Sequence, residues 1–477
     1  MKNSKLIEIL RSFSKQDLKK MDQMVHSSFF TQSENLKYLF SFLHKFAPNF
    51  DDPLLNDEDA HKAVYKDLSF KQNRINKLRH NLYNIALQYI YYNYYTEDNL
   101  LNNIAILNYA EDKGLTKVLK GHINEIEKKQ EQLKIKSGDH FYIEFFLQQV
   151  RSRLKYLEDK GNGDILLENV SIALDKFYIL NKLILFSHQI IREKITGHDY
   201  SYSMKKEILD AMPDSKHVNI PIVSLWYNTF LMVQEKDNFQ YYKKLKSLLD
   251  EQAGQLPKLD IRNICGCLQN TARTFFRDEA LFEELFFLYE LQQKHGVFTY
   301  ANGNYLTATI FFNIAKVGLI LQKTSWVKEF LNKHTYKYNS EANNVNALCQ
   351  AELAFSENDY DQALHFLQQS DVMNVYLKLI RRRSYLKVFY EKGEKYASSF
   401  KAAIDRNRTF ISRNKESLNS TQLTAHWSFV NTLKTIANYR QSQDRDSKLI
   451  HELEEKVHRA EYIAEKKWLL QKIKFLK

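Results

Sequence analysis

The chain has 477 residues, with 69 lysines and arginines against 57 aspartates and glutamates, and its formal net charge is +12. It contains only 12 glycines and 5 prolines, and no proline follows residue 257. Because a proline inside a helix costs about 3 kcal/mol, this composition favours an all-α fold. The N-terminus has no apolar signal region and no run of 18 apolar residues occurs, so the sequence predicts a cytoplasmic protein without a membrane span.

Residues 1–95 are predicted to form a separate N-terminal helical module. Ser14 and Thr31 each stand three residues before an acidic residue, which is the pattern of a helix N-cap. Asn56 precedes an acidic run that suits the positive end of a helix dipole. The next helix is predicted to bury one face, because its apolar residues follow a helical spacing: Ile75, Leu78, Leu82, Ile85 and Tyr89.

Residues 96–300 are predicted to form an irregular array of helical hairpins. A hinge is expected at the glycine-rich turn 160–163, and a long helix is expected at 165–195. From Val223 onward the expected helices form regular pairs: 223–234 with 238–252, 260–276 with 279–294, 304–321 with 325–333, 343–356 with 360–369, 372–391 with 394–412, and 417–440 with 446–475.

A two-helix unit recurs in the last third of the chain, residues 301–477. Trp326 precedes Tyr360 by 34 residues, and Asn358 precedes Gly393 by 35. Helical hairpins that repeat at this period stack into a solenoid, in which each hairpin packs on its neighbours. The sequence therefore predicts a helical-hairpin solenoid that follows the N-terminal module.

The turn of one hairpin resembles a known repeat. Its sequence, NDYDQA at 358–363, is similar to the G-[DE]-Y-x-x-A turn of the tetratricopeptide (TPR) repeat, with Asn358 in place of the glycine. Ala351 and Ala363 stand where that repeat has small residues. The resemblance implies a TPR-like superhelix whose concave groove is lined by the first helix of each hairpin. The segments 26–43 and 465–477 also resemble uncharacterised TPR-like proteins of Bacteroidetes-type bacteria, which implies no activity.

The strongest local excess of positive charge lies at residues 371–420, which contain twelve basic and five acidic residues. The TPR resemblance implies that Ile380, Arg383, Lys387 and Tyr390 face the groove and that its cations hold carboxylates of a bound peptide. Arginine suits this role because its guanidinium fork matches a carboxylate. We therefore expect a partner-binding site at Arg381, Arg382, Arg383, Lys387 and Tyr390. The alternative is that the three arginines only solvate a helix surface.

A second basic element lies in the N-terminal module. The segment 61–89 is compatible with a helix-turn-helix, and residues 62–80 carry six lysines and arginines with one aspartate. Arg74, Lys77 and Asn81 share the face opposite the apolar stripe, and these residue types contact phosphates and base edges. A nucleic-acid-binding regulatory protein is therefore the alternative to a protein-binding scaffold.

No motif for a nucleotide, a catalytic metal or a nucleophilic serine occurs in the chain. Cys265, Cys267 and Cys349 do not match a metal-finger spacing and are predicted to be buried thiols. The sequence thus predicts a non-catalytic scaffold that binds an acidic protein partner and needs no cofactor or metal. A hydrolase assembled from distant carboxylates stays open at this point.

The last predicted helix, 446–475, carries an apolar seam at Ile450, Leu453, Val457, Ala460 and Ala464. This seam is typical of a helix that caps a solenoid or of a coiled-coil dimer contact. Capping within the chain is the preferred interpretation, because a solenoid needs its last apolar face covered.

Overall fold

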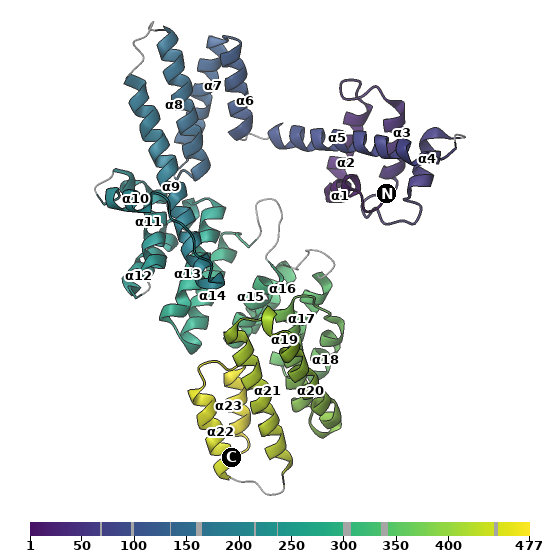
Figure 1. Cartoon of the computed structure of the whole chain (residues 1–477), viewed down its shortest axis with the longest axis vertical. Coiled ribbons are helices and arrows are strands. Elements are labelled where there is room, and N and C mark those ends of the chain that lie inside the picture. The colour runs from purple at the N-terminus through teal and green to yellow at the C-terminus, as the bar shows by residue number, and fades with distance from the viewer. Residues whose placement is uncertain are drawn as a thin grey trace. The chain divides into compact units, whose positions relative to one another are not determined.

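The structure is a computed structural model of the whole chain, and it describes residues 1–66, 69–96, 100–133, 135–158, 165–213, 216–235, 237–298, 307–334, 342–442 and 447–477. Within these ranges every regular element is a helix, which confirms the all-α prediction (Figure 1). The chain divides into two compact units, Met1–Leu133 with Asp139–Asp175, and Lys134–Gly138 with Lys176–Lys477. The hinge predicted at 160–163 lies outside the described residues, and the predicted boundaries at 95 and 300 stay predictions.

The described residues of the first unit form eight helices and the beginning of a ninth. They are α1 (Lys5–Ser12), α2 (Lys15–His26), α3 (Glu34–His44), α4 (Asp57–Tyr65), α5 (Gln72–Thr96), α6 (Leu100–Asp112), α7 (Thr116–Glu131) and α8 (Gly138–Glu158), with α9 (Ile165–Thr196) continuing into the second unit. The long helix α5 contacts each of α1 to α4, so these five helices share one hydrophobic core. All five residues of the predicted apolar face of α5 are buried in that core.

Helix starts in this unit follow the polar residues that precede them. Ser14 is the N-cap of α2, as predicted, and Asn56 is the N-cap of α4, whose first turn carries the predicted acidic residues; each cap accepts a hydrogen bond from a backbone N–H of the first turn. The prediction for Thr31 was wrong. Helix α3 begins after Ser33, and the Thr31 hydroxyl accepts a hydrogen bond from the Ser33 N–H in the preceding turn instead.

The second unit consists of the remaining helices, most of which pair with the next helix along the chain. They are α10 (Lys205–Ala211), α11 (Pro221–Gln234), α12 (Phe239–Gln252), α13 (Lys258–Phe275), α14 (Asp278–Lys294), α15 (Ala308–Ile320), α16 (Thr324–Lys333), α17 (Ala342–Ser356), α18 (Tyr360–Gln369), α19 (Val375–Glu391), α20 (Ala397–Arg413), α21 (Ser420–Gln441), α22 (Ser447–Arg459) and α23 (Lys466–Lys474). Short 3₁₀ helices at 216–219, 253–255, 393–396 and 415–417 join some of them.

The turn between α17 and α18 shows how the repeat pattern is built. Asn358 takes a left-handed backbone conformation (φ +62°), which explains how it can replace a glycine, since asparagine tolerates this region better than most residues. Asp359 then caps α18 by accepting a hydrogen bond from the Gln362 N–H at 3.0 Å. Ala351 and Ala363 are fully buried where the two helices meet.

Helices of successive pairs also contact one another. Helix α15 contacts α17, α17 contacts α19, and α19 contacts α21, so these four helices form a row. This row positions the candidate site described below. One core extends from α14 to α19, and a second core joins α19 to α23.

The end of the chain differs from the prediction of a single helix at 446–475. The chain reverses after α22, and α23 starts at Lys466 after Glu465, whose backbone is left-handed (φ +55°). Ile450, Leu453 and Val457 are buried against the same chain, as the capping interpretation predicted. Ala460 and Ala464 belong to the reversal rather than to a helical seam. None of the helices in the described ranges combines the length and the apolar composition that crossing a bilayer requires.

Candidate binding site around Glu465

The site predicted on α19 divides into two groups of residues. Arg383, Lys387 and Tyr390 are buried and contact the C-terminal segment of the chain, residues 460–477. Arg381 and Arg382 point elsewhere. Arg381 donates a hydrogen bond to the Leu367 carbonyl at 3.1 Å, and Arg382 lies over the ring of Phe410 at 4.4 Å. Only the first group therefore belongs to one site.

The centre of this site is the carboxylate of Glu465. Its oxygens lie 3.1 Å from Nε of Arg383, 2.9 Å from Nζ of Lys387 and 3.1 Å from Nζ of Lys316. Lys316 also pairs with Glu352 at 2.6 Å, and Glu352 accepts a hydrogen bond from the Ser384 hydroxyl. Lys316 lies on α15, and Arg383 and Lys387 lie on α19, so two helices of the row supply the cations that contact Glu465, while α17 supplies Glu352, which pairs with Lys316.

These charged groups are largely removed from water. The Lys387, Glu352 and Glu465 side chains are 3%, 4% and 11% exposed. Burial alone would raise the pKa of Glu352, but Lys316 and Lys387 outweigh it and lower that pKa to about 2. The same cations, with Arg383, hold the pKa of Glu465 well below its usual range against the effect of burial. Both carboxylates are therefore ionised at neutral pH.

The fit between Arg383 and Glu465 is incomplete. Although the two groups form an ion pair, the buried Nε of Arg383 has no hydrogen-bond acceptor in suitable geometry among the described residues. A buried donor without an acceptor costs free energy, because it has lost its bonds to water. The cationic pocket thus has hydrogen-bonding capacity that the Glu465 carboxylate does not use.

An aromatic pocket lies beside the charged one. The ring of Trp468 contacts Phe355, Tyr390 and Phe429, with ring centroids 6.5, 5.6 and 6.3 Å apart. Its indole N–H donates a hydrogen bond to Glu391 at 2.9 Å. Lys387 joins the two pockets, since its Nζ lies 4.2 Å from the Phe355 ring centroid. Together they hold an acidic residue and an aromatic residue of one short segment.

Comparison of the chain with protein-family models, with curated proteins and with solved structures gives no match. The site is therefore interpreted from its own geometry.

Sequence reasoning missed Lys316, Glu352, Glu465 and Trp468, although one signal for three of the charged residues exists. Glu352 follows Lys316 by 36 residues and precedes Lys387 by 35, close to the repeat period. Charged residues that recur at equivalent positions of successive repeats would have indicated a charged row. Nothing in the sequence linked them to Glu465, because no repeat relates it to them.

The second predicted site is exposed. Arg74 and Lys77 lie on the surface of α5, Asn81 is half-buried on the same helix, and the Arg74 guanidinium lies 5.6 Å from the Tyr65 ring centroid. Lys62, Lys66 and Lys71 are exposed on the neighbouring turns. Within the described ranges none of the five cations forms an ion pair with a carboxylate, so this surface carries uncompensated positive charge.

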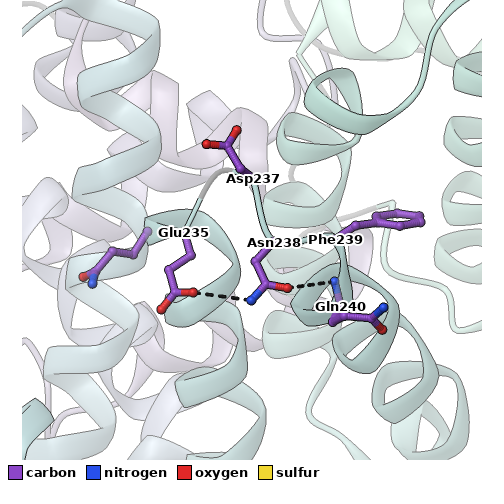
Figure 2. A pocket seen from close by; sticks show the side chains of 6 residues that line it. Glu235, Asp237, Asn238, Phe239 and Gln240 are labelled. Atoms are coloured by element: carbon purple, nitrogen blue, oxygen red, sulfur yellow. Dashed lines mark hydrogen bonds between the residues drawn. The ribbon is translucent and has the colours of Figure 1, made fainter.

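Two surface depressions are also present in the second unit. The first lies at the turn between α11 and α12, where the Asn238 side chain donates to Glu235 at 3.5 Å and accepts from the Gln240 N–H at 3.1 Å (Figure 2). Asn238 thereby caps α12, so this polar cluster serves the turn itself. The second depression is lined by glutamates and aromatic residues of α14 and α16, which include Glu283, Phe287 and Trp326.

The three cysteines are reduced and buried, as predicted. Burial raises the pKa of the Cys267 thiol to about 12, so the reactive thiolate form is suppressed. Across the described residues, histidine, cysteine and carboxylate side chains form no group of three that could hold a metal ion.

Proposed function

We propose that the chain is a non-catalytic, TPR-like solenoid scaffold that binds a protein partner through an acidic side chain. The proposed site is the row of α15, α17 and α19 around Lys316, Arg383 and Lys387. The proposal rests on the position of the Glu465 carboxylate, whose oxygens lie within 3.1 Å of three cations from two helices.

Stability alone is a poor explanation for these charges. Removing two ions from water costs several kcal/mol each, and well-packed apolar residues of similar volume are often as stabilising as a buried ion pair. A helix row that keeps a buried cation on α15 and two on α19 therefore has a property that an apolar row would lack. It can distinguish a carboxylate from an apolar group.

Capture of partners by the tagged full-length chain in its native cells tests this proposal. Lys316→Gln removes one cation of the pocket, whereas Lys328→Gln on α16 removes a surface lysine that pairs with Glu357 and serves as the matched control. We expect a protein partner to be retained by the wild type and by Lys328→Gln and to be lost with Lys316→Gln. Circular dichroism ensures that the loss is not caused by unfolding. Equal retention by all three chains, or no enriched protein, would contradict the proposal.

Nucleic-acid binding by the first unit is the second candidate function. The observation that favours it is the exposed basic surface formed by Lys62, Lys66, Lys71, Arg74 and Lys77, which have no ion pair with any described carboxylate. If all five contact phosphates, the logarithm of the affinity for duplex DNA falls with that of the salt concentration with a slope of about −4 to −5. Lys71→Gln/Lys77→Gln should reduce that slope by about 2, and Lys117→Gln/Lys128→Gln should not change it. Absence of binding to DNA and RNA at low salt would eliminate this candidate.

A further inference from the structure

We infer that residues 460–477 are an intramolecular ligand, which occupies the carboxylate site until a helix of a partner protein displaces it. This inference rests on the proposed partner-binding function and specifies the partner and its regulation. The partner helix carries an acidic residue and, three positions later, a large aromatic residue.

The C-terminal segment contacts the helix row in a defined pattern. Glu465 enters the cationic pocket, and Trp468 enters the aromatic pocket of Phe355, Tyr390 and Phe429. Residues three and four positions apart lie on the same face of a helix. Leu469 and Ile473, which are fully buried, extend this face by one further turn. The segment therefore presents an acidic residue directly before a helix, followed by an aromatic residue and two aliphatic residues of that helix, in fixed order.

The segment is attached to the helix row mainly by side chains. Within the described ranges, its one backbone hydrogen bond to the row joins the Ala464 N–H to the Ala425 carbonyl at 3.0 Å. All other contacts with the helix row are made by side chains. Helix α23 has nine residues, and an isolated helix of this length is marginal in water. A detached segment would thus lose its helix, and a longer preformed helix of a partner would have an advantage over it.

The C-terminal segment also fits its binding site imperfectly. Glu465 holds a left-handed backbone (φ +55°), which side chains other than glycine and asparagine rarely adopt. Its carboxylate also leaves Nε of Arg383 without a hydrogen-bond acceptor. A partner carboxylate that reaches the site from an unstrained backbone avoids this cost and can accept this bond. Displacement by such a segment is therefore favoured over displacement by an unrelated surface.

The net charge of the site limits what can replace the C-terminal segment. Lys316, Arg383 and Lys387 face Glu352 and Glu465, so the occupied site has a formal charge of +1. When Glu465 leaves, the charge becomes +2, and any new occupant that closes the site buries this charge again. Because an unpaired buried charge is strongly unfavourable, the vacated site needs another carboxylate. This requirement excludes a purely apolar helix as the occupant.

Binding of a labelled peptide to the full-length chain tests the inference. The probe is a synthetic peptide with the sequence of residues 460–477 and a fluorescein at its N-terminus, and the readout is fluorescence anisotropy. In the chain variant Glu465→Gln the attached segment competes less well. We expect this variant to bind the peptide at least about tenfold more tightly than the wild type, because a larger fraction of its sites is free. Glu461→Gln changes an exposed carboxylate of the same segment and should leave the affinity unchanged.

Two altered peptides show whether the predicted pattern is recognised. Peptides with Glu465→Gln or with Trp468→Ala should each bind the Glu465→Gln chain at least about tenfold more weakly than the natural peptide, since each lacks one of the two anchoring contacts. Equal binding of all three peptides would overturn the acidic and aromatic pattern.

The remaining outcomes separate this inference from the proposed function. If no peptide binds a folded, monomeric Glu465→Gln chain, the segment is a fixed part of the fold and the inference is wrong. Partner capture that depends on Lys316 would then still support the scaffold. If light scattering shows that the Glu465→Gln chain dimerises, the segment exchanges between two copies and the proposed partner is wrong. If the Glu465→Gln chain unfolds, the substitute experiment measures amide hydrogen exchange of residues 460–477 in the wild-type chain with excess peptide. An exchange rate that the peptide does not increase would overturn the inference.

Discussion

At the scale of single residues, His426 on α21 lies beside the charged cluster and has one of the most strongly shifted pKa values in the chain. Burial, together with the positive charge of Arg383, lowers the pKa of His426 to about 3, although Glu465 acts in the opposite direction. The imidazole is therefore neutral in the folded protein at neutral pH. Its edge-to-face contact with Tyr376 shows that it also serves as a packed aromatic ring.

This shift makes the stability of the second unit depend on pH. Below pH 6.5 the unfolded chain binds a proton at His426, whereas the folded chain binds it only near pH 3. The free energy of unfolding therefore falls as the pH falls. Between pH 7 and pH 5 the loss from this residue is about 2 kcal/mol. His426→Phe keeps the ring and removes the proton site, so it should lose about 2 kcal/mol less than the wild type over this range.

Urea unfolding followed by tryptophan fluorescence measures this difference, because all four tryptophans belong to the second unit. Glu352 and Glu465 add their own loss only below about pH 4.5, the range in which unfolded glutamates titrate, so they do not obscure the comparison. The same pH dependence in both chains would show that His426 is not buried in its neutral form.

The sequence was informative about some residues of the site and silent about others. The TPR resemblance implied that Arg383, Lys387 and Tyr390 lie on one face of α19, and these three residues do contact the same C-terminal segment. The residue that meets them could not be predicted. Glu465 is 78 positions from Lys387, and its approach depends on a chain reversal that no repeat specifies. Whether these residues bind a partner stays a prediction.

At the scale of elements, Gly318 shows how closely two helices of a pair can approach. It lies inside α15, where alanine would be the better helix former. A Cβ atom at Gly318 would lie 2.5 Å from a methyl carbon of Val327 on α16, and the Val327 side chain is buried and branched. The glycine therefore permits the close contact between α15 and α16.

We expect Gly318→Ala to destabilise the second unit by about 1–3 kcal/mol, the usual cost of overpacking a core. Gly266→Ala on α13 is the matched control, because a Cβ atom there meets no atom within 4 Å. That change should raise the stability by up to about 1 kcal/mol, through the higher helix propensity of alanine. Urea unfolding shows whether the free energy of unfolding falls for Gly318→Ala and rises for Gly266→Ala. Similar stabilisation by both would mean that α15 and α16 pack less closely.

Helix positions were largely predictable because the local signals were strong. Apolar periodicity indicated the pairs from α11 to α21, and caps such as Ser14 and Asn56 marked helix starts. The break between α22 and α23 was missed because residues 460–465 contain neither glycine nor proline. After the break, Leu469 and Ile473 pack on the helix row and Glu465 pairs with Lys387. A local sequence pattern shows neither of these contacts.

At the scale of the whole molecule, the proposed account assigns a separate task to each part of the second unit. The helix row supplies the pockets, and the C-terminal segment controls access to them. Stability in a protein built of successive helix pairs is local, so a terminal segment can open without global unfolding. The account requires that α23 detach while α21, on which it packs, stays folded.

Hydrogen exchange of the full-length wild-type chain, read by mass spectrometry, tests this requirement most directly. The account predicts that the amides of α23, Lys466–Lys474, exchange at least about 100-fold faster than the buried amides of α21, Ser420–Gln441, because they open locally. It also predicts that an excess of the peptide 460–477 further speeds exchange in α23 alone. Equal protection of α23 and α21, unchanged by the peptide, would contradict the account, because the segment would then open only with the rest of the fold.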